Sequence, residues 1–230
     1  MINFAKNGKK INEIILLKEG GPITKLEEIS QHFIVDDQLW KDLQSADPAI
    51  ISQNCQVQFN AEEKYYLIPV LNEIYKVFPK EKILVKTIPD NSIPEFQVEL
   101  TLFLLHYLLG TKAIPLKGIL VSEKDLKGGE MFFRGPHSLS VTGVIRKFGN
   151  DPEGFIAAGL RLNGKRVLLG DAAIELKPAP LIPLTYVLWK EDEEFPAAVK
   201  ILFDPTIQEF LPLDVIYGIT MFVSHRLIEV

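Results

Sequence analysis

The stretch 184–204, LTYVLWKEDEEFPAAVKILFD, decides the fold of this chain. Its second half alternates, so that Val199, Ile201 and Phe203 fall on one face of a strand. Its first half is apolar or aromatic on both faces apart from one threonine, which is typical of a strand covered on both sides within a sheet. The stretch therefore predicts a β-hairpin at the centre of the fold, with Trp189 and Phe203 as core residues.

The composition limits the classes of partner. With 47% hydrophobic and 24% charged residues among 230, the chain resembles an ordinary globular protein. The net charge is −5 and no basic stripe is visible, so we expect no nucleic-acid partner. The longest apolar run, 102–109, is far shorter than the roughly 20 residues that a spanning helix needs, so we expect no membrane partner.

The chain has a single cysteine, Cys55, which excludes a disulfide within the chain and a cysteine-rich metal centre. Such sparing use of cysteine suits a reducing compartment, and we expect a cytoplasmic protein. Cys55 alternates with polar residues in the manner of a strand. This pattern predicts a small core residue rather than a nucleophile, because no histidine is near it in the sequence.

Strands are expected in two groups, over about 55–87 and 165–204, where short runs with a period of two are separated by turn residues. An apolar helix follows each group, over about 94–110 and 212–228. Both helices are apolar round most of their circumference, as in helices that are buried on nearly all sides. The sequence therefore predicts an α+β fold of mainly antiparallel strands packed by apolar helices.

The N-terminal residues 1–50 have a different pattern from the rest. A capping box precedes an expected helix over 25–33, and a second helix is expected over 36–45. We interpret this segment as a helical appendage or cover, and residues 51–230 as a single α+β domain.

Several short sequence motifs follow one another along the chain. They are LLHYLLG at 104–110, GDAA at 170–173, LW at 188–189, DEEFPA at 192–197, ILFD at 201–204 and LP at 211–212. This order resembles the prokaryotic family catalogued as domain of unknown function 3786, over roughly residues 55–228. The chain departs from the family at Glu191, where the family tends to have glycine.

The resemblance implies a link with strict anaerobes. Some members of the family are similar to corrinoid-dependent one-carbon proteins in carrying an iron–sulfur domain, which a chain with one cysteine lacks. The leading hypothesis is therefore a non-catalytic binding or accessory protein of anaerobic metabolism, serving a corrinoid or redox enzyme. A corrinoid or another tetrapyrrole is the cofactor that this hypothesis allows, and a protein or a small apolar ligand is the expected partner.

His106 is the first candidate site residue, on the expected helix over 94–110. Glu95 and Glu99 share its face, because spacings of four and seven residues are near whole turns. With a rise of about 1.5 Å per residue, Glu99 and His106 lie about 10 Å apart and cannot pair directly. A histidine that ligates corrinoid cobalt would agree with the link to corrinoid-dependent proteins that the resemblance implies. We favour a core histidine, which burial keeps neutral at pH 7.

Arg134 and His137 are the next candidates, on either side of a Gly-Pro pair in an expected loop. Together they have the chemistry to bind an anion near a helix N-terminus. With His106 they make the second hypothesis, an enzyme with an unfamiliar site. The common nucleotide-binding, hydrolase and zinc-protease motifs are absent from the sequence, which argues against those classes of enzyme.

The acidic bend, defined by Glu191, Asp192, Glu193 and Glu194, gives the third hypothesis. Four carboxylates at a hairpin tip suit a basic partner, so the protein would be a structural interaction module. The bend lacks the spaced ligands and the glycine of a calcium loop, and we expect no metal there. The alternative is a solvated loop that discourages pairing between sheet edges.

Overall fold

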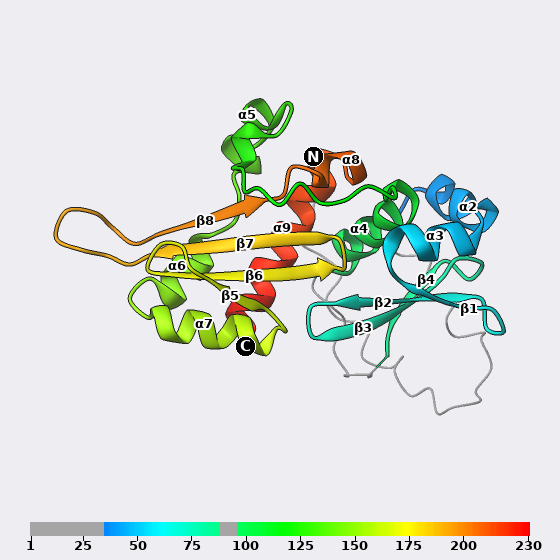
Figure 1. The fold of residues 1–230 in the computed structure, drawn as a ribbon, viewed down its shortest axis with the longest axis horizontal. Coiled ribbons are helices and arrows are strands. Elements are labelled where there is room, and N and C mark those ends of the chain that lie inside the picture. Colours follow the sequence, from blue (N-terminus) through cyan, green and yellow to red (C-terminus); the bar gives the residue numbers. More distant parts are fainter. Residues whose placement is uncertain (1–34, 88–95) are drawn as a thin grey trace, which may run out of the picture.

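The computed structural model describes residues 35–87 and 96–230 and has two four-stranded antiparallel sheets, each a simple meander (Figure 1). The first sheet comprises β1 (Gln58–Asn60), β2 (Tyr65–Val70), β3 (Glu73–Phe78) and β4 (Ile83–Lys86). The second comprises β5 (Lys165–Val167), β6 (Ala172–Ala179), β7 (Ile182–Trp189) and β8 (Ala198–Phe203). The predicted α+β class and the two groups of antiparallel strands are confirmed.

The two predicted apolar helices are α4 (Gln97–Gly110) and α9 (Leu213–Glu229), and they pack against each other. The shorter helices are α2 (Asp37–Ser45), α3 (Pro48–Cys55), α5 (Gly129–Phe132), α6 (Thr142–Phe148), α7 (Pro152–Arg161) and α8 (Ile207–Phe210), with 3-10 turns η2 (Glu123–Asp125) and η3 (Gly135–His137). Among the helices of the described residues, none is long and apolar enough to cross a bilayer.

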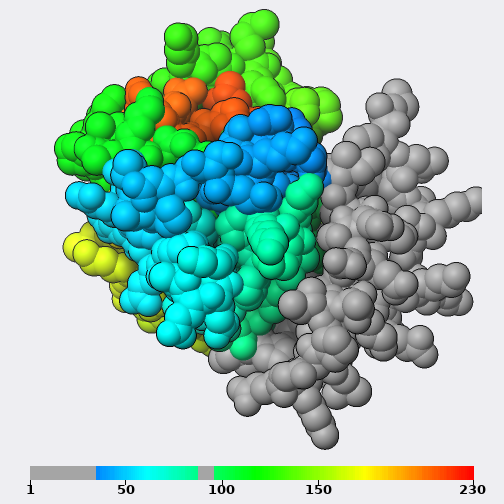
Figure 2. Space-filling model, turned by 90° about the vertical axis from the view of Figure 1, so that its right-hand side faces the viewer, coloured from blue at the N-terminus to red at the C-terminus, as the bar shows by residue number. Residues whose placement is uncertain are grey.

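The helix predicted over 36–45 is α2, whose N-cap Asp36 accepts a hydrogen bond from the backbone of Gln38 at 2.9 Å. Trp40 and Leu43 are buried, and α2 packs on α4. Figure 2 shows α2 and α3 side by side next to the first sheet. The helix predicted over 25–33 lies outside the described residues.

The second sheet is centred on β7, which is buried on both faces except at its end, as its sequence predicted. The hydroxyl of Tyr186 donates to the carbonyl oxygen of Thr220 at 3.2 Å and lies 3.0 Å from Ser224 Oγ. Complete burial raises the pKa of Tyr186, so the phenol stays neutral. This pair of contacts fixes α9 against the inner face of β7.

The two sheets are joined directly. Leu71, after β2, donates its backbone N–H to the carbonyl oxygen of Lys177 in β6 at 3.2 Å. The guanidinium of Arg226 on α9 lies 2.7 Å from a carboxylate oxygen of Glu73 on β3, and both side chains are largely buried. Salt and solvent screen such a poorly exposed ion pair only weakly. The pair connects the first sheet to α9, the helix that supports the second sheet.

The prediction that Trp189 is a core residue is wrong, whereas Phe203 is fully buried as predicted. Trp189 is 38% exposed, and the ammonium of Lys200 lies 5.7 Å from its ring centroid. The alternation of β7 turns Leu188 inward and Trp189 outward, away from α7 and α9. Both faces of β7 are covered along its middle, but the cover ends before its last residue.

The predicted core position of Cys55 is confirmed, but its predicted strand is wrong. Cys55 ends α3, a helix capped by the Asp47 side chain, and Gln56 then takes a left-handed conformation with φ 53° before β1 starts. The Cys55 sulfur lies 3.4 Å from the carbonyl oxygen of Tyr107. Burial raises the pKa of the Cys55 thiol to about 12, which disfavours the nucleophilic thiolate.

Asp204, directly after β8, is 4% exposed and connects distant parts of the chain. Its carboxylate accepts hydrogen bonds from the backbone N–H of Gly118 at 2.7 Å, Thr206 at 2.9 Å and Lys117 at 3.2 Å. Burial would raise the pKa of Asp204, but the hydrogen bonds from Thr206, Gly118 and Lys117 hold it below its usual value. Asp204 thereby fixes the chain before residue 121 beside the end of β8.

Val121 continues this arrangement as an isolated antiparallel bridge to Phe203, with both N–H···O distances 2.9 Å. The strand pairing then ends because Ser122 caps η2, which packs beside β8. The Ser122 hydroxyl and backbone N–H lie 2.6 and 2.9 Å from the Asp125 carboxylate. Among the described strands, β8 therefore pairs only with β7 over the rest of its length.

We expect Asp204→Ala to lower the free energy of unfolding by about 2–3 kcal/mol at pH 7, because backbone donors lose their buried acceptor. The folded pKa is depressed, so this stabilisation is present above the unfolded value of 3.8 and is lost as the pH falls through the folded pKa. Urea denaturation of the wild type and Asp204→Ala between pH 7 and pH 3 measures the difference in their free energies of unfolding. This difference should become smaller below about pH 4.

The control is Asp192→Ala, which removes an exposed carboxylate that also accepts backbone N–H groups. We expect a smaller loss from this control. Equal stability of Asp204→Ala and the wild type at pH 7 would contradict the structural role given to Asp204.

Candidate functional site

His106 lies on the side of α4 that faces α9 and is partly buried. Burial lowers the pKa of His106, and the negative charge of Asp214 on α9 acts in the opposite direction. Glu99, on the same face, packs beside Gly218, where an added Cβ would lie 3.5 Å from the Glu99 side chain. The face predicted from helical spacing is thus a packing face, and Glu95 lies outside the described residues.

Arg134 and His137 lie on the chain around η3, and both are exposed. The Arg134 guanidinium forms an ion pair with Glu130 at 2.8 Å. The His137 ring stacks on Phe132 with centroids 4.8 Å apart and meets the Tyr217 ring edge-on at 5.5 Å. The backbone N–H of His137 donates to the carbonyl oxygen of Arg134 at 3.1 Å, but the two side chains contact different neighbours.

The three histidine and arginine candidates therefore form no common cluster joined by hydrogen bonds or ion pairs in the part of the chain that is described. Within that part, no three His, Cys, Asp or Glu side chains gather closely enough to hold a metal ion. General acid–base chemistry requires groups within hydrogen-bond reach of one substrate atom. This arrangement does not favour the enzyme hypothesis.

The acidic bend between β7 and β8 is exposed and is ordered by Asp192. Its carboxylate accepts hydrogen bonds from the backbone of Glu194 at 2.9 Å and Phe195 at 2.8 Å, which lower the pKa of Asp192. Glu191 borders a shallow cleft of about 430 Å³ that Arg146 and Lys147 also line.

Exposed apolar side chains lie at the same end of the second sheet as the acidic bend. They are Leu168 at 90% exposure, Phe195 at 66%, Leu169 at 39% and Trp189 at 38%, and we call them the hairpin-end surface. A Cβ added to Gly170 would lie 3.3 Å from the Trp189 ring, so the loop after β5 runs beside the indole. The backbone N–H of Lys190 also donates to Asp171 at 2.9 Å.

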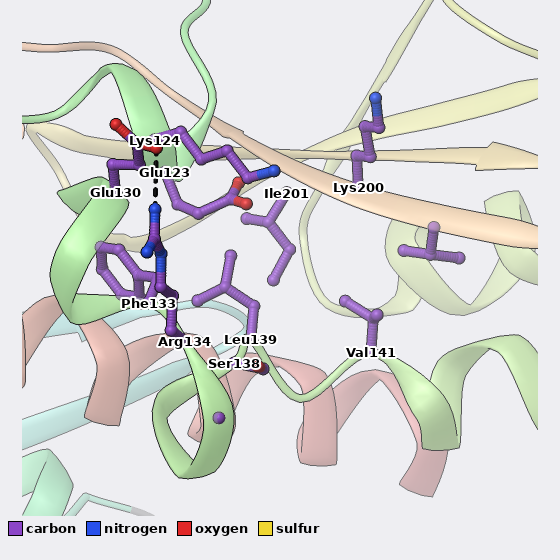
Figure 3. A pocket seen from close by; sticks show the side chains of 12 residues that line it. Glu123, Lys124, Glu130, Phe133, Arg134, Ser138, Leu139, Val141, Lys200 and Ile201 are labelled. Carbon is purple, nitrogen blue, oxygen red and sulfur yellow. Dashed lines mark hydrogen bonds and ion pairs between the residues drawn. The ribbon is translucent and has the colours of Figure 1, made fainter.

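A second feature, the β8 groove, has a volume of about 460 Å³ and runs along the outer edge of β8 (Figure 3). One side is β8 at 199–201, and the other is the chain over 133–141. Leu139, Val141 and Ile201 face the space between these two sides, and the side chains of η2 reach toward it. Arg134 borders this groove, whereas His106 and His137 do not line it.

A family model, described as Domain of unknown function (DUF3786), matches residues 47–226 of this chain. The chain belongs to this family. The match contains both sheets, the acidic bend, the hairpin-end surface and the β8 groove, in agreement with the resemblance found in the sequence. No curated protein and no solved structure matches the chain.

We expect the pKa of His106, measured by NMR titration, to lie below the ordinary value of 6.5. Since the folded pKa is depressed, the wild type should lose stability relative to His106→Leu as the pH falls from about 7 to 5. The control Asp214→Asn should lower the His106 pKa further, because it removes the opposing negative charge. A pKa above 6.5 would instead make a charged pair with Asp214 the dominant interaction.

Proposed function

We propose that this protein is a non-catalytic binding protein that docks a partner protein through the hairpin-end surface. The observation that carries the proposal is the exposure of Trp189, Leu168 and Phe195 together at one end of the second sheet. Tryptophan and phenylalanine are enriched at protein interfaces and tryptophan is prominent among residues that dominate binding energy. Apolar side chains clustered beside charged ones are typical of an interaction site.

The acidic bend indicates the chemistry of the partner. Its four carboxylates lie beside the apolar side chains, and the hydrogen bonds of Asp192 hold the bend in one conformation. Complementary charge at the rim of an interface selects partners and accelerates association. The proposed partner therefore presents an apolar patch bordered by lysine or arginine.

The separate surroundings of His106, Arg134 and His137 support a non-catalytic role, as does the high thiol pKa of Cys55. The partial burial of His106 on α4, a helix that packs against α9, favours a packing role over ligation of a corrinoid. The place of the protein in anaerobic metabolism, beside a corrinoid or redox enzyme, rests on the family resemblance. Its single cysteine supports a cytoplasmic location.

Affinity capture from an anaerobic lysate tests this function, with mass spectrometry of the retained proteins. The baits are the wild type, the double variant Leu168→Ser/Trp189→Ser, and the control Ile50→Ser, which removes a 57% exposed side chain on α3. We expect a partner that the wild type and Ile50→Ser retain and the double variant loses. Because the rim is charged, retention should also weaken as the salt concentration rises.

Two other results would each contradict this proposal. Retention of the same proteins by all three baits would place the binding surface elsewhere. A small molecule converted by the purified protein, with activity lost in His106→Leu, would replace this proposal by the enzyme hypothesis.

A further inference from the structure

We propose that the β8 groove binds an extended segment of a protein as an additional strand on the edge of the second sheet. The segment alternates apolar and acidic residues and pairs with β8 at Val199 and Ile201. This site goes beyond the hairpin-end surface, because its ligand is recognised mainly through backbone hydrogen bonds.

The backbone of β8 supplies the first argument. The N–H and C=O of Phe203 both point away from β7, since they bond to Val121. Hydrogen-bonding direction alternates along a strand, so the same groups of Ile201 and Val199 also point away from β7. Within the described chain, no hydrogen-bond partner is recorded for these outward groups. Ile201 is only 1% exposed, and unpaired backbone groups at such burial are rare in native proteins.

The path of the neighbouring chain supplies the second argument. Val121 begins a strand on this edge, but the capping of η2 by Ser122 ends the pairing after one bridge. The edge opposite Ile201 and Val199 is therefore left to the groove, which these two residues line. A segment that runs antiparallel to β8 would continue the ladder from the bridge at Phe203.

The shape of the groove decides between a single chain and a second copy of the protein. The segment 133–141 forms a wall opposite β8 (Figure 3). A second copy would bring its own β8 with the same wall in front of it, so the two edges cannot meet. A single extended chain brings no such wall, and the volume of about 460 Å³ is within the usual range of ligand clefts.

The side chains around the groove give the chemistry of the segment. Leu139 and Val141 offer an apolar surface to every second residue of an added strand. Lys200 extends from the other face of β8, away from this apolar surface, and the side chain of Lys124 reaches in from η2.

The charges of the groove leave a net attraction for an acidic segment. Arg134 is neutralised by its ion pair with Glu130. Lys124 and Lys200 have no carboxylate within ion-pair distance in the described chain, and Glu123 is the remaining anion of the lining. Lys200, whose ammonium lies beside the Trp189 ring, is on the face of β8 toward which the residues between the apolar ones would point, so its charge favours acidic residues at those positions.

A synthetic peptide tests this inference with the full-length protein. The probe is a fluorescein-labelled, capped peptide, Ser-Val-Glu-Val-Glu-Val-Ser, whose binding is measured by fluorescence anisotropy. Two matched peptides carry N-methyl groups on alternate backbone amides, in the two possible registers. In an added strand only one set of amides faces β8, so one methylated peptide should bind like the probe and the other should lose binding.

Charge reversal tests the acidic chemistry separately. We expect Lys124→Glu to weaken the probe about fivefold, as for an exposed ion pair, and to favour the peptide with lysine in place of glutamate. Lys80→Glu, an exposed change on the first sheet, is the matched control and should leave binding unchanged. Absence of probe binding, or equal binding of both methylated peptides, would overturn the added strand. An unchanged affinity in Lys124→Glu would overturn the acidic segment.

Discussion

The buried carboxylate of Asp204 is the interaction on which the arrangement around β8 depends. It accepts hydrogen bonds from three backbone N–H groups, two of them from the distant Lys117 and Gly118. A buried charge is costly unless its hydrogen bonds are satisfied, so these contacts hold the two chain segments in one position. Val121 is thereby brought onto the edge of β8, and the following turn leaves the rest of that edge without a neighbouring strand.

The hairpin of β7 and β8 consequently presents two different surfaces. Its end carries the exposed Trp189 beside the acidic bend, and its edge carries unpaired backbone groups at Val199 and Ile201. The support behind both is rigid, because Tyr186 fixes β7 to α9 through buried hydrogen bonds. Binding groups on a rigid element lose little conformational entropy on association, which suits a protein that acts by docking rather than by chemistry.

The periodicity of the sequence predicted the strands, the two apolar helices and the burial of Phe203, because these depend on local patterns that repeat over many residues. The periodicity failed for Trp189, because no local pattern shows where the elements that pack on the faces of a strand end. It also failed for the helix that ends at Cys55, where a capping Asp outweighed a short alternation. The groove could not be predicted, because Leu139 and Val141 lie in irregular chain that is far from β8 in the sequence.

Amide hydrogen exchange along β8 in the free protein tests the central claim, an unpaired sheet edge, most directly. The N–H groups of Lys200 and Leu202 point toward β7 and should be protected by the ladder. Those of Val199 and Ile201 point toward the groove and should exchange more than about tenfold faster. Equal protection of all four amides would contradict the account.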